Sequence, residues 1–301
     1  MNIEVPENSK ADVTIAICTF RRTSLFETLS SLLSLNDREN YNLSVVVIDN
    51  DETDTLRGTV AKFSKTYSLP LNYVHAPSKN ISIARNGALN TVATRWMLFI
   101  DDDEIADKDW LKNIMSMRSD AHVVIGQCQA TYSDEQPGWL SRCDFHSNRL
   151  SGRPENAYTS NALIDMDFVK AHDFSFREEL GLTGGEDTIF FRQIFEAGGV
   201  IKYCPSALVY EPVPQGRASM SWVKTRKFRA GQTHGLLCKD FDPSAFRLLL
   251  VTAGSKMIVS AIMAFVTIPG TDGSRRWWAR AYLHAGAVRY RLKPTILEEY
   301  R

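Results

Sequence analysis

The segment Trp96-Met97-Leu98-Phe99-Ile100-Asp101-Asp102-Asp103-Glu104 passes from an unbroken apolar run directly into four acidic residues. The apolar run predicts a short strand that is buried on both faces, since such a strand needs no polar alternation. Carboxylates gathered at the end of a buried strand repel one another, and a hard cation such as Mg²⁺ or Mn²⁺ relieves that repulsion. The alternative is an acidic turn that opens the next helix, because acids are favoured at helix N-termini.

Three further apolar runs precede this strand, with helical patterns between them, over residues 13–18, 43–48 and 71–75. Strands that alternate with helices predict an α/β fold with a mostly parallel sheet covered on both faces. In such sheets, ligands collect at the carboxyl ends of the strands. Asp49, which follows the second run, is therefore expected to line the same cleft as the acids after residue 100.

The second half of the chain is less regular. Residues 127–160 are rich in polar residues and are expected to form a long loop region over a site. Strands are predicted over 160–164 and 200–203. Between them, Gly184-Gly185-Glu186-Asp187 opens a helix that stops at Gly198-Gly199. The two acids either cap that helix or supply a general base next to backbone that a ligand can approach closely.

Composition indicates a globular protein, with 44% hydrophobic and 23% charged residues in 301. The five cysteines are scattered without a C-x-x-C pair, so we expect reduced thiols rather than a disulfide or zinc framework. The first twelve residues are polar and lack the apolar run of a secretory signal. These features favour a cytoplasmic protein.

Charge is divided unevenly along a chain whose formal net charge is zero. Residues 217–301 contain 15 Lys and Arg against 5 Asp and Glu, which leaves 20 basic and 30 acidic residues for the remainder. The basic end either meets an anionic partner or is a solvated pair of helices. Nucleic acid is not the expected partner, because the basic surplus lies in an apolar, Trp-bearing region without a nucleic-acid motif.

Residues 248–268 are nearly unbroken in apolarity and long enough to span a bilayer. Lys256 near the centre opposes spanning, since a central Lys costs about 2.5–3.5 kcal/mol. A basic aromatic helix is predicted over 274–292. Together these segments favour peripheral membrane contact through residues 245–292, while a soluble helical extension and a true span remain the alternatives.

The motifs in order resemble family 2 glycosyltransferases with the GT-A fold. They are strand–Cys18-Thr19-Phe20-Arg21-Arg22, Val47-Ile48-Asp49-Asn50, Asn80-(x4)-Arg85-Asn86, Phe99-Ile100-Asp101-Asp102-Asp103 and Gly185-Glu186-Asp187. The tail more narrowly resembles bacterial exopolysaccharide glycosyltransferases of the succinoglycan (ExoM-like) type. That likeness rests on Tyr210-Glu211-Pro212-Val213-Pro214, Arg226-(x2)-Arg229-(x)-Gly231-Gln232-Thr233-His234 and Leu297-Glu298-Glu299-Tyr300.

The resemblance implies a role for each matching position. Asp187 would be the general base, with Glu186 beside it, and Asp103, the last acid of a D-x-D motif, would bind Mg²⁺ or Mn²⁺. Relatives often carry a His as a further metal ligand near Tyr210. Nucleotide contacts would come from Thr19, Arg21, Asp49, Arg85, Asp101 and Asp102. Contacts to the acceptor or pyrophosphate would come from Trp222, Arg226 and Arg229.

The resemblance also implies an inverting transfer of a hexose, with UDP-glucose as the suggested donor, onto a lipid-linked saccharide at the inner face of the cytoplasmic membrane. The expected domains are a GT-A domain over 1–235, with a nucleotide-binding half at 13–125 and an acceptor half at 126–235, and a helical extension over 236–301.

Two other functions compete with this one. A sugar-nucleotide nucleotidyltransferase would carry a glycine-rich phosphate loop after the first strand, and Thr19-Phe20-Arg21-Arg22 contains no glycine. The other alternative is a non-catalytic nucleotide-sugar or membrane-binding module that keeps the fold without the chemistry.

Overall fold

The computed structural model describes residues 10–150 and 154–298 in two compact units. The first unit contains residues 10–129, 148–181 and 186–211, and the second contains 130–147, 182–185 and 212–298. The domain division at residue 235 stays a prediction. Glu299 and Tyr300 of the closing motif lie outside the described residues.

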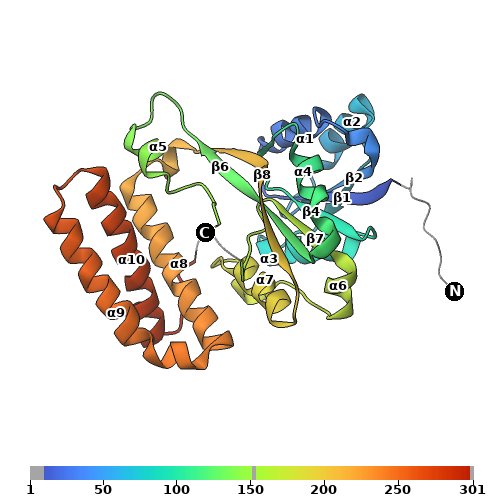
Figure 1. Ribbon diagram of the computed structural model, residues 1–301. Helices are drawn as coiled ribbons and strands as arrows, with labels where there is room; N and C mark the ends of the chain where they lie inside the picture. Colours follow the sequence, from blue (N-terminus) through green and yellow to red (C-terminus); the bar gives the residue numbers. More distant parts are fainter. Residues whose placement is uncertain (1–9, 151–153, 299–301) are drawn as a thin grey trace. The chain divides into compact units, whose positions relative to one another are not determined.

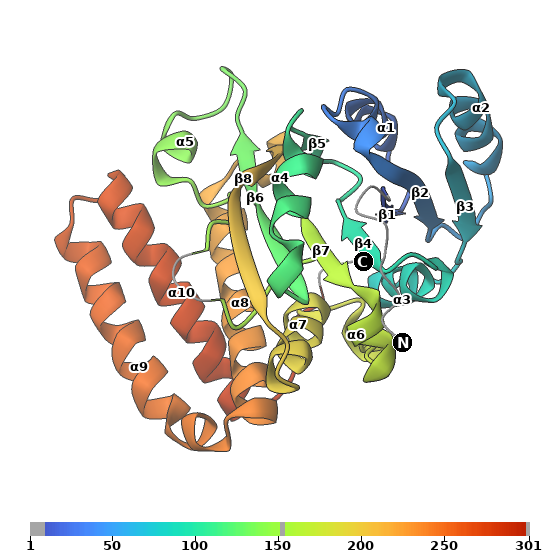
Figure 2. The same cartoon turned by 45° about the vertical axis from the view of Figure 1, so that its right-hand side comes forward.

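An eight-stranded mixed sheet with the order β3-β2-β1-β4-β7-β6-β8-β5 forms the centre of the first unit, and its strands from β3 to β8 can be followed from right to left in Figure 2. The strands are β1 (Ala11–Thr19), β2 (Tyr41–Asp49), β3 (Leu71–His75), β4 (Trp96–Phe99), β5 (Ile105–Ala106), β6 (Val123–Thr131), β7 (Ala162–Asp165) and β8 (Ile201–Pro212). The helices, which Figure 1 labels, are α1 (Leu25–Leu33), α2 (Arg57–Tyr67), α3 (Ile81–Thr91), α4 (Trp110–Ser116), α5 (Trp139–Cys143), α6 (Met166–Ala171), α7 (Glu186–Glu196), α8 (Met220–Phe241), α9 (Pro243–Val266) and α10 (Asp272–Leu292).

The predicted parallel arrangement holds for β3, β2, β1 and β4, which pair in parallel with one another. The register places Thr19 opposite Asp49, so the carboxyl ends of β1 and β2 are level. From β4 onward the pairing changes, because β7 runs antiparallel to both β4 and β6, and β5 runs antiparallel to β8. The α/β fold is therefore confirmed, with a sheet that is mixed beyond its first four strands.

The two faces of the sheet build separate hydrophobic cores, because successive side chains along a strand point to opposite faces. On β1, Ile15 and Ile17 belong to one core and Ala16 to the other. The first core also contains buried residues of α1 and α4, and the second contains those of α3, α6 and α7. Each face is thus covered, as expected for a parallel sheet.

Two local features differ from the sequence expectations. Residues 127–160 are not loop throughout, because β6 continues to Thr131 and α5 lies within this range. The sequence pattern after the third strand predicts a helix capped by Ser82, but α3 begins at Ile81. The amide oxygen of Asn80 accepts hydrogen bonds from the backbone of Ser82 and Ile83 at 3.0 and 3.2 Å. Asn is among the strongest N-cap residues, so it fixes the start of α3.

The second unit is built on the long helices α8, α9 and α10, coloured orange to red in Figure 1. Close packing of α8 on α10 requires glycine. A Cβ atom on Gly231 would lie 1.8 Å from the backbone oxygen of Leu283, and one on Gly286 would lie 1.8 Å from that of Phe228. Gln232, also on α8, is 1% exposed and binds the backbone of Thr295 and Leu297.

Candidate active site

The four acids after β4 alternate between half-exposed and buried positions. Asp101 and Asp103 are partly open to solvent, whereas Asp102 and Glu104 are 6% and 1% exposed. Glu104 accepts a hydrogen bond from the backbone N–H of Asp101 at 2.9 Å, and Asp102 accepts one from the hydroxyl of Thr19 at 2.7 Å. The two inner carboxylates are therefore buried and hydrogen-bonded to the protein, whereas Asp101 and Asp103 are partly exposed.

The charge of this cluster is only partly compensated. Arg22, in the turn after β1, forms an ion pair with Asp103 and lies 3.5 Å from Asp102. Burial raises the pKa of Asp102 to about 6, although Arg22 and Thr19 oppose the shift. Burial also raises the pKa of Asp101 to about 7, and the neighbouring acids add to it while Arg85 opposes it. Crowded, desolvated carboxylates of this kind are stabilised by added positive charge.

A divalent metal fits this donor set in its chemistry. Carboxylate oxygens are the ligands that Mg²⁺ and Mn²⁺ prefer, and a cation would relieve the repulsion that raises the pKa of Asp101. Within residues 10–150 and 154–298, no three His, Cys, Asp or Glu residues are grouped closely enough to hold a metal by themselves. Oxygens of a bound diphosphate or water would therefore complete the coordination around Asp101 and Asp103.

The ends of β1 and β2 form a second polar group. Asp49 is fully buried and accepts hydrogen bonds from the Tyr73 hydroxyl at 2.6 Å and from the Asp51 backbone at 3.0 Å. Arg21 adopts a left-handed backbone conformation, with φ 53°, and its guanidinium lies 2.8 Å from Asp51. The hydrogen bond from Arg21 lowers the pKa of Asp51 to about 2.

Asn50 is a structural residue of this group that the sequence did not single out. Its side-chain N–H groups donate to the Ala76 carbonyl at 2.8 Å and the Ser78 hydroxyl at 2.7 Å. Its amide oxygen accepts from the Asn80 backbone at 2.6 Å. Asn50 thus ties the end of β2 to the turn before α3. The sequence signal was only that an amide follows a predicted strand.

Arg85 and Glu186 form a buried ion pair that joins α3 to α7, with side chains only 9% and 5% exposed. Burial works against the charge of Arg85, but Glu186, Asp101 and Asp187 outweigh it and raise the pKa of the guanidinium. The guanidinium of Arg85 therefore interacts with both acidic groups, the one after β4 and the one at the start of α7. The role of Arg85 at the nucleotide stays a prediction.

Asp187 lies half-buried in the first turn of α7. Its carboxylate accepts a hydrogen bond from the Thr188 backbone at 2.6 Å. Gly184 and Gly185 precede the helix with φ of 78° and 91°, a backbone conformation that glycine adopts without strain. This arrangement presents a partly accessible carboxylate at a helix N-terminus.

Tyr210 pairs with Ile105 in the β5–β8 ladder, and its hydroxyl lies 3.4 Å from Asp107. The carboxylate of its neighbour Glu211 accepts a hydrogen bond from the thiol of Cys128 at 3.8 Å. Burial raises the pKa of Asp101 most, the neighbouring acids Asp103 and Asp102 raise it further, and Glu211 adds a smaller contribution. The sequence included Glu211 in a motif without assigning it a role.

The three residues expected at the acceptor or pyrophosphate all lie on α8 in the second unit. Trp222 stacks on His146 with ring centroids 4.8 Å apart, and the guanidinium of Arg226 lies over the same indole at 5.2 Å. Arg229 donates a hydrogen bond to the Thr183 carbonyl at 3.2 Å. Their contacts with substrate stay predictions.

Sequence comparison gives the class. The family described as glycosyl transferase family 2 matches residues 14–195, more than half of the chain, so the protein belongs to that family. The chain is also 37% identical over 299 residues to the succinoglycan biosynthesis protein ExoM of Rhizobium meliloti (strain 1021), with 97% of each protein covered. The expected resemblance is thereby confirmed.

Solved structures share the fold. The mannosyltransferase PcManGT from Pyrobaculum calidifontis, in complex with GDP-Man and Mn²⁺, superposes with a TM-score of 0.64 at 19% identity, covering 94% of this chain and 87% of that one. TarS 1-349 from S. aureus, in complex with UDP-GlcNAc, gives a TM-score of 0.53 at 14% identity, covering 96% and 97%. At these identities the likeness supports the GT-A fold and nothing finer.

Proposed function

We propose that this glycosyltransferase is inverting and metal-dependent, and that it moves a hexose from a nucleotide-sugar onto a saccharide acceptor in bacterial exopolysaccharide biosynthesis. The observation that carries the proposal is one electrostatic group formed by the acids after β4, the ion pair of Arg85 with Glu186, and Asp187. Such a group combines negative charge for a metal diphosphate with a carboxylate that can accept a proton.

The proposed reaction is a single displacement. The Asp187 carboxylate takes the proton of an acceptor hydroxyl as the hydroxyl oxygen attacks the anomeric carbon. The bond from that carbon to the diphosphate oxygen breaks, and the bonding electrons leave with the nucleotide diphosphate. Attack from the face opposite the leaving group inverts the anomeric centre. Orientation of the two substrates and charge stabilisation supply most of the rate enhancement.

Asp103, with Asp101 beside it, would hold Mg²⁺ or Mn²⁺, which when bound would neutralise negative charge on the leaving diphosphate. Arg22, already paired with Asp103, is a further cation at this edge. Asp49 and Arg21 stay our candidates for the base of the nucleotide, and Thr19, Arg85 and Asp102 are assigned to the nucleotide on the family pattern.

UDP-glucose is the proposed donor and a lipid-linked saccharide the proposed acceptor, and the enzyme would work at the inner face of the cytoplasmic membrane. The similarity to a protein named for succinoglycan biosynthesis supports an exopolysaccharide product. Trp222, Arg226 and Arg229 are proposed to contact the acceptor or the pyrophosphate.

Two variants test the proposal. Asp187→Asn should lower kcat by about 10²–10⁴-fold, the usual contribution of a general base, while a thermal shift with UDP and metal persists. Asp103→Ala should abolish the metal-dependent part of that shift. Glu196→Gln, at the other end of α7 with a side chain 42% exposed, is the matched control and should keep both properties.

Full turnover by Asp187→Asn would remove this residue as the base, whereas a wild-type protein that binds nucleotide-sugars without turnover would support the non-catalytic alternative. If no nucleotide stabilises the wild-type protein with either metal, the donor site is wrongly placed. NMR of the anomeric proton in the first product formed would decide between inversion and retention.

A further inference from the structure

The helix α9 exposes its large apolar side chains and buries its small ones. Six residues, Val251, Ile258, Val259, Ile262, Phe265 and Val266, are between 54 and 72% exposed. Their spacing places them on one side of the helix, given 3.6 residues per turn. A surface helix of a soluble protein normally shows the reverse pattern, with its large apolar residues turned to the core.

The opposite side of α9 makes the contacts with the other helices of its unit. Leu249, Ala253, Ser260 and Ala264 are the buried residues of α9, each at most 4% exposed. Leu249 and Ala253 pack with Cys238 and Ala287 of the neighbouring helices. A narrow, mostly small-residue stripe thus holds the helix, and the wide apolar side is left to an external partner.

The exposed polar residues in the middle of α9 are Thr252, Ser255 and Lys256. Burial lowers the pKa of the His234 imidazole on α8 and of the His284 imidazole on α10, and the positive charge of Lys256 lowers both further. Lys256 is therefore close enough to act on both rings. The hydroxyls of Thr252 and Ser255 donate to backbone carbonyls one turn earlier, both at 3.1 Å. A hydroxyl satisfied within its own helix can enter an apolar medium at little cost.

The packing of α9 argues against a transmembrane orientation. Among the described residues, α9 is the one helix that is long and apolar enough to cross a bilayer. Only 22% of its most apolar 18-residue stretch is buried. Yet α10 bonds to both of its ends, with Ser274 donating to the Ala264 carbonyl at 2.9 Å and Arg291 to the Phe246 carbonyl at 3.1 Å. Spanning would carry the charged helix α10 into the bilayer.

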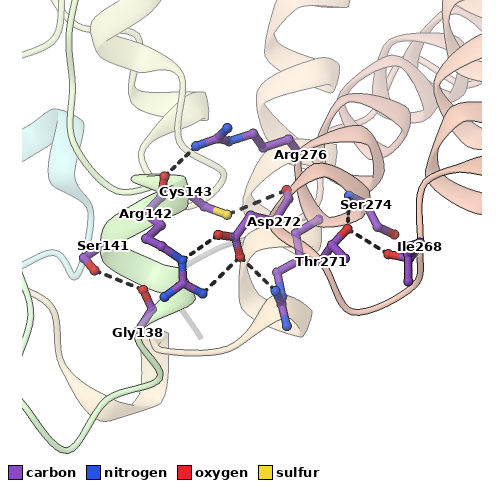
Figure 3. Close-up of polar contacts among 10 residues, drawn as sticks. Gly138, Ser141, Arg142, Cys143, Ile268, Thr271, Asp272, Ser274 and Arg276 are labelled. Carbon is purple, nitrogen blue, oxygen red and sulfur yellow. Dashed lines mark hydrogen bonds and ion pairs between the residues drawn. The ribbon is translucent and has the colours of Figure 1, made fainter.

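The turn between α9 and α10 is fixed by polar contacts with α5, as Figure 3 shows. The Asp272 carboxylate accepts from Arg142 at 2.6 Å and from Arg275 at 3.0 Å, and Arg276 donates to the Arg142 carbonyl at 2.5 Å. At this end of α9, two arginines therefore bind one carboxylate, and a third arginine, Arg276, binds the backbone of Arg142. At its other end Arg247 is exposed. Basic groups at both ends of an apolar face are complementary to anionic headgroups.

We infer that α9 lies in the plane of an anionic lipid surface, with the outward face of Val251, Ile258, Ile262 and Phe265 inserted at the headgroup–acyl boundary. This inference rests on the proposed membrane location and specifies the surface that makes the contact. Insertion of apolar side chains supplies affinity, and the arginines add a dependence on lipid charge.

Vesicle sedimentation of the full chain tests the inference. The wild type should bind vesicles that contain phosphatidylglycerol at least about tenfold more tightly than pure phosphatidylcholine, since each basic residue near an anionic surface adds to affinity. Alkaline carbonate should release it. Ile262→Glu with Phe265→Glu should reduce binding by more than about tenfold, because two exposed apolar groups are replaced by anions. Tyr67→Glu, an exposed aromatic residue of α2, is the matched control.

Each contrary outcome is distinct. Retention of the wild type in the membrane after carbonate would show a span, and absence of binding would show a soluble extension. A change of solution mass from dimer to monomer in the double variant would assign the face to a second copy of the chain. The UDP thermal shift of the same variant, expected to equal that of the wild type, reports separately on the proposed function.

Discussion

Removal of Arg85 should destabilise the protein more than removal of its partner Glu186. Both side chains are less than 10% exposed, so solvent screens their interaction little. Deleting one member of a buried ion pair costs about 3–5 kcal/mol, because the other charge is left buried. Arg85 also opposes the charges of Asp101 and Asp187. We therefore place Arg85→Met near 5 kcal/mol and Glu186→Gln near 3 kcal/mol.

The measurement is a double-mutant cycle by urea unfolding of the metal-free protein at pH 7. The double variant, Arg85→Met with Glu186→Gln, should be less destabilised than the sum of the singles by about 2 kcal/mol, since coupled pairs deviate by 0.5–3 kcal/mol. The control is the same cycle for the surface pair of Arg192 and Glu196 on α7, with Arg192→Met and Glu196→Gln. Its coupling energy should be below about 1 kcal/mol.

Two results would refute the reasoning. Additive losses within about 0.5 kcal/mol would mean that Arg85 and Glu186 are not coupled in the folded protein. A larger loss for Glu186→Gln than for Arg85→Met would mean that Asp101 and Asp187 do not share the guanidinium. In that case Arg85 would not link the two acidic groups.

Three further variants test the site. Glu104 is buried, and burial raises its pKa well above 4.5, so its contribution to the stability of the wild type should be lost as pH rises above 4.5. In urea unfolding between pH 5 and 8, the stability of Glu104→Gln should therefore decline less steeply than that of the wild type. Equal slopes for the two proteins would contradict this prediction. Thr19→Val should cost about 1–3 kcal/mol in the same assay and raise the pKa of Asp102 above about 6, because it deletes the hydrogen bond to a buried carboxylate. Gly185→Ala should lower both stability and kcat, because the added Cβ strains the backbone and collides with Thr233. Gly198→Ala is the control for backbone strain alone, because Gly198 has a similar φ of 85° with open space where a Cβ would lie. Equal effects of the two substitutions would show that the collision with Thr233 is unimportant.

Periodicity located the elements that follow simple local rules. The strand over residues 71–75 was predicted to the residue, and the apolar runs at 13–18 and 43–48 lie within β1 and β2. The expected loop over 127–160 was partly wrong, because the polar residues at the end of β6 lie within a strand that faces solvent in part. Composition cannot distinguish such a strand from a loop.

The sequence by itself determined the α/β class, the acids at the end of β4 and the position of Asp187 at a helix start, because each depends on neighbours within a few residues. Only the tertiary structure decided which acids are inward, that Arg85 pairs with Glu186, and that Lys256 lies beside His234 and His284. Arg85 and Glu186 are 101 residues apart. Their contact depends on how α3 and α7 pack on the sheet, which no local pattern encodes.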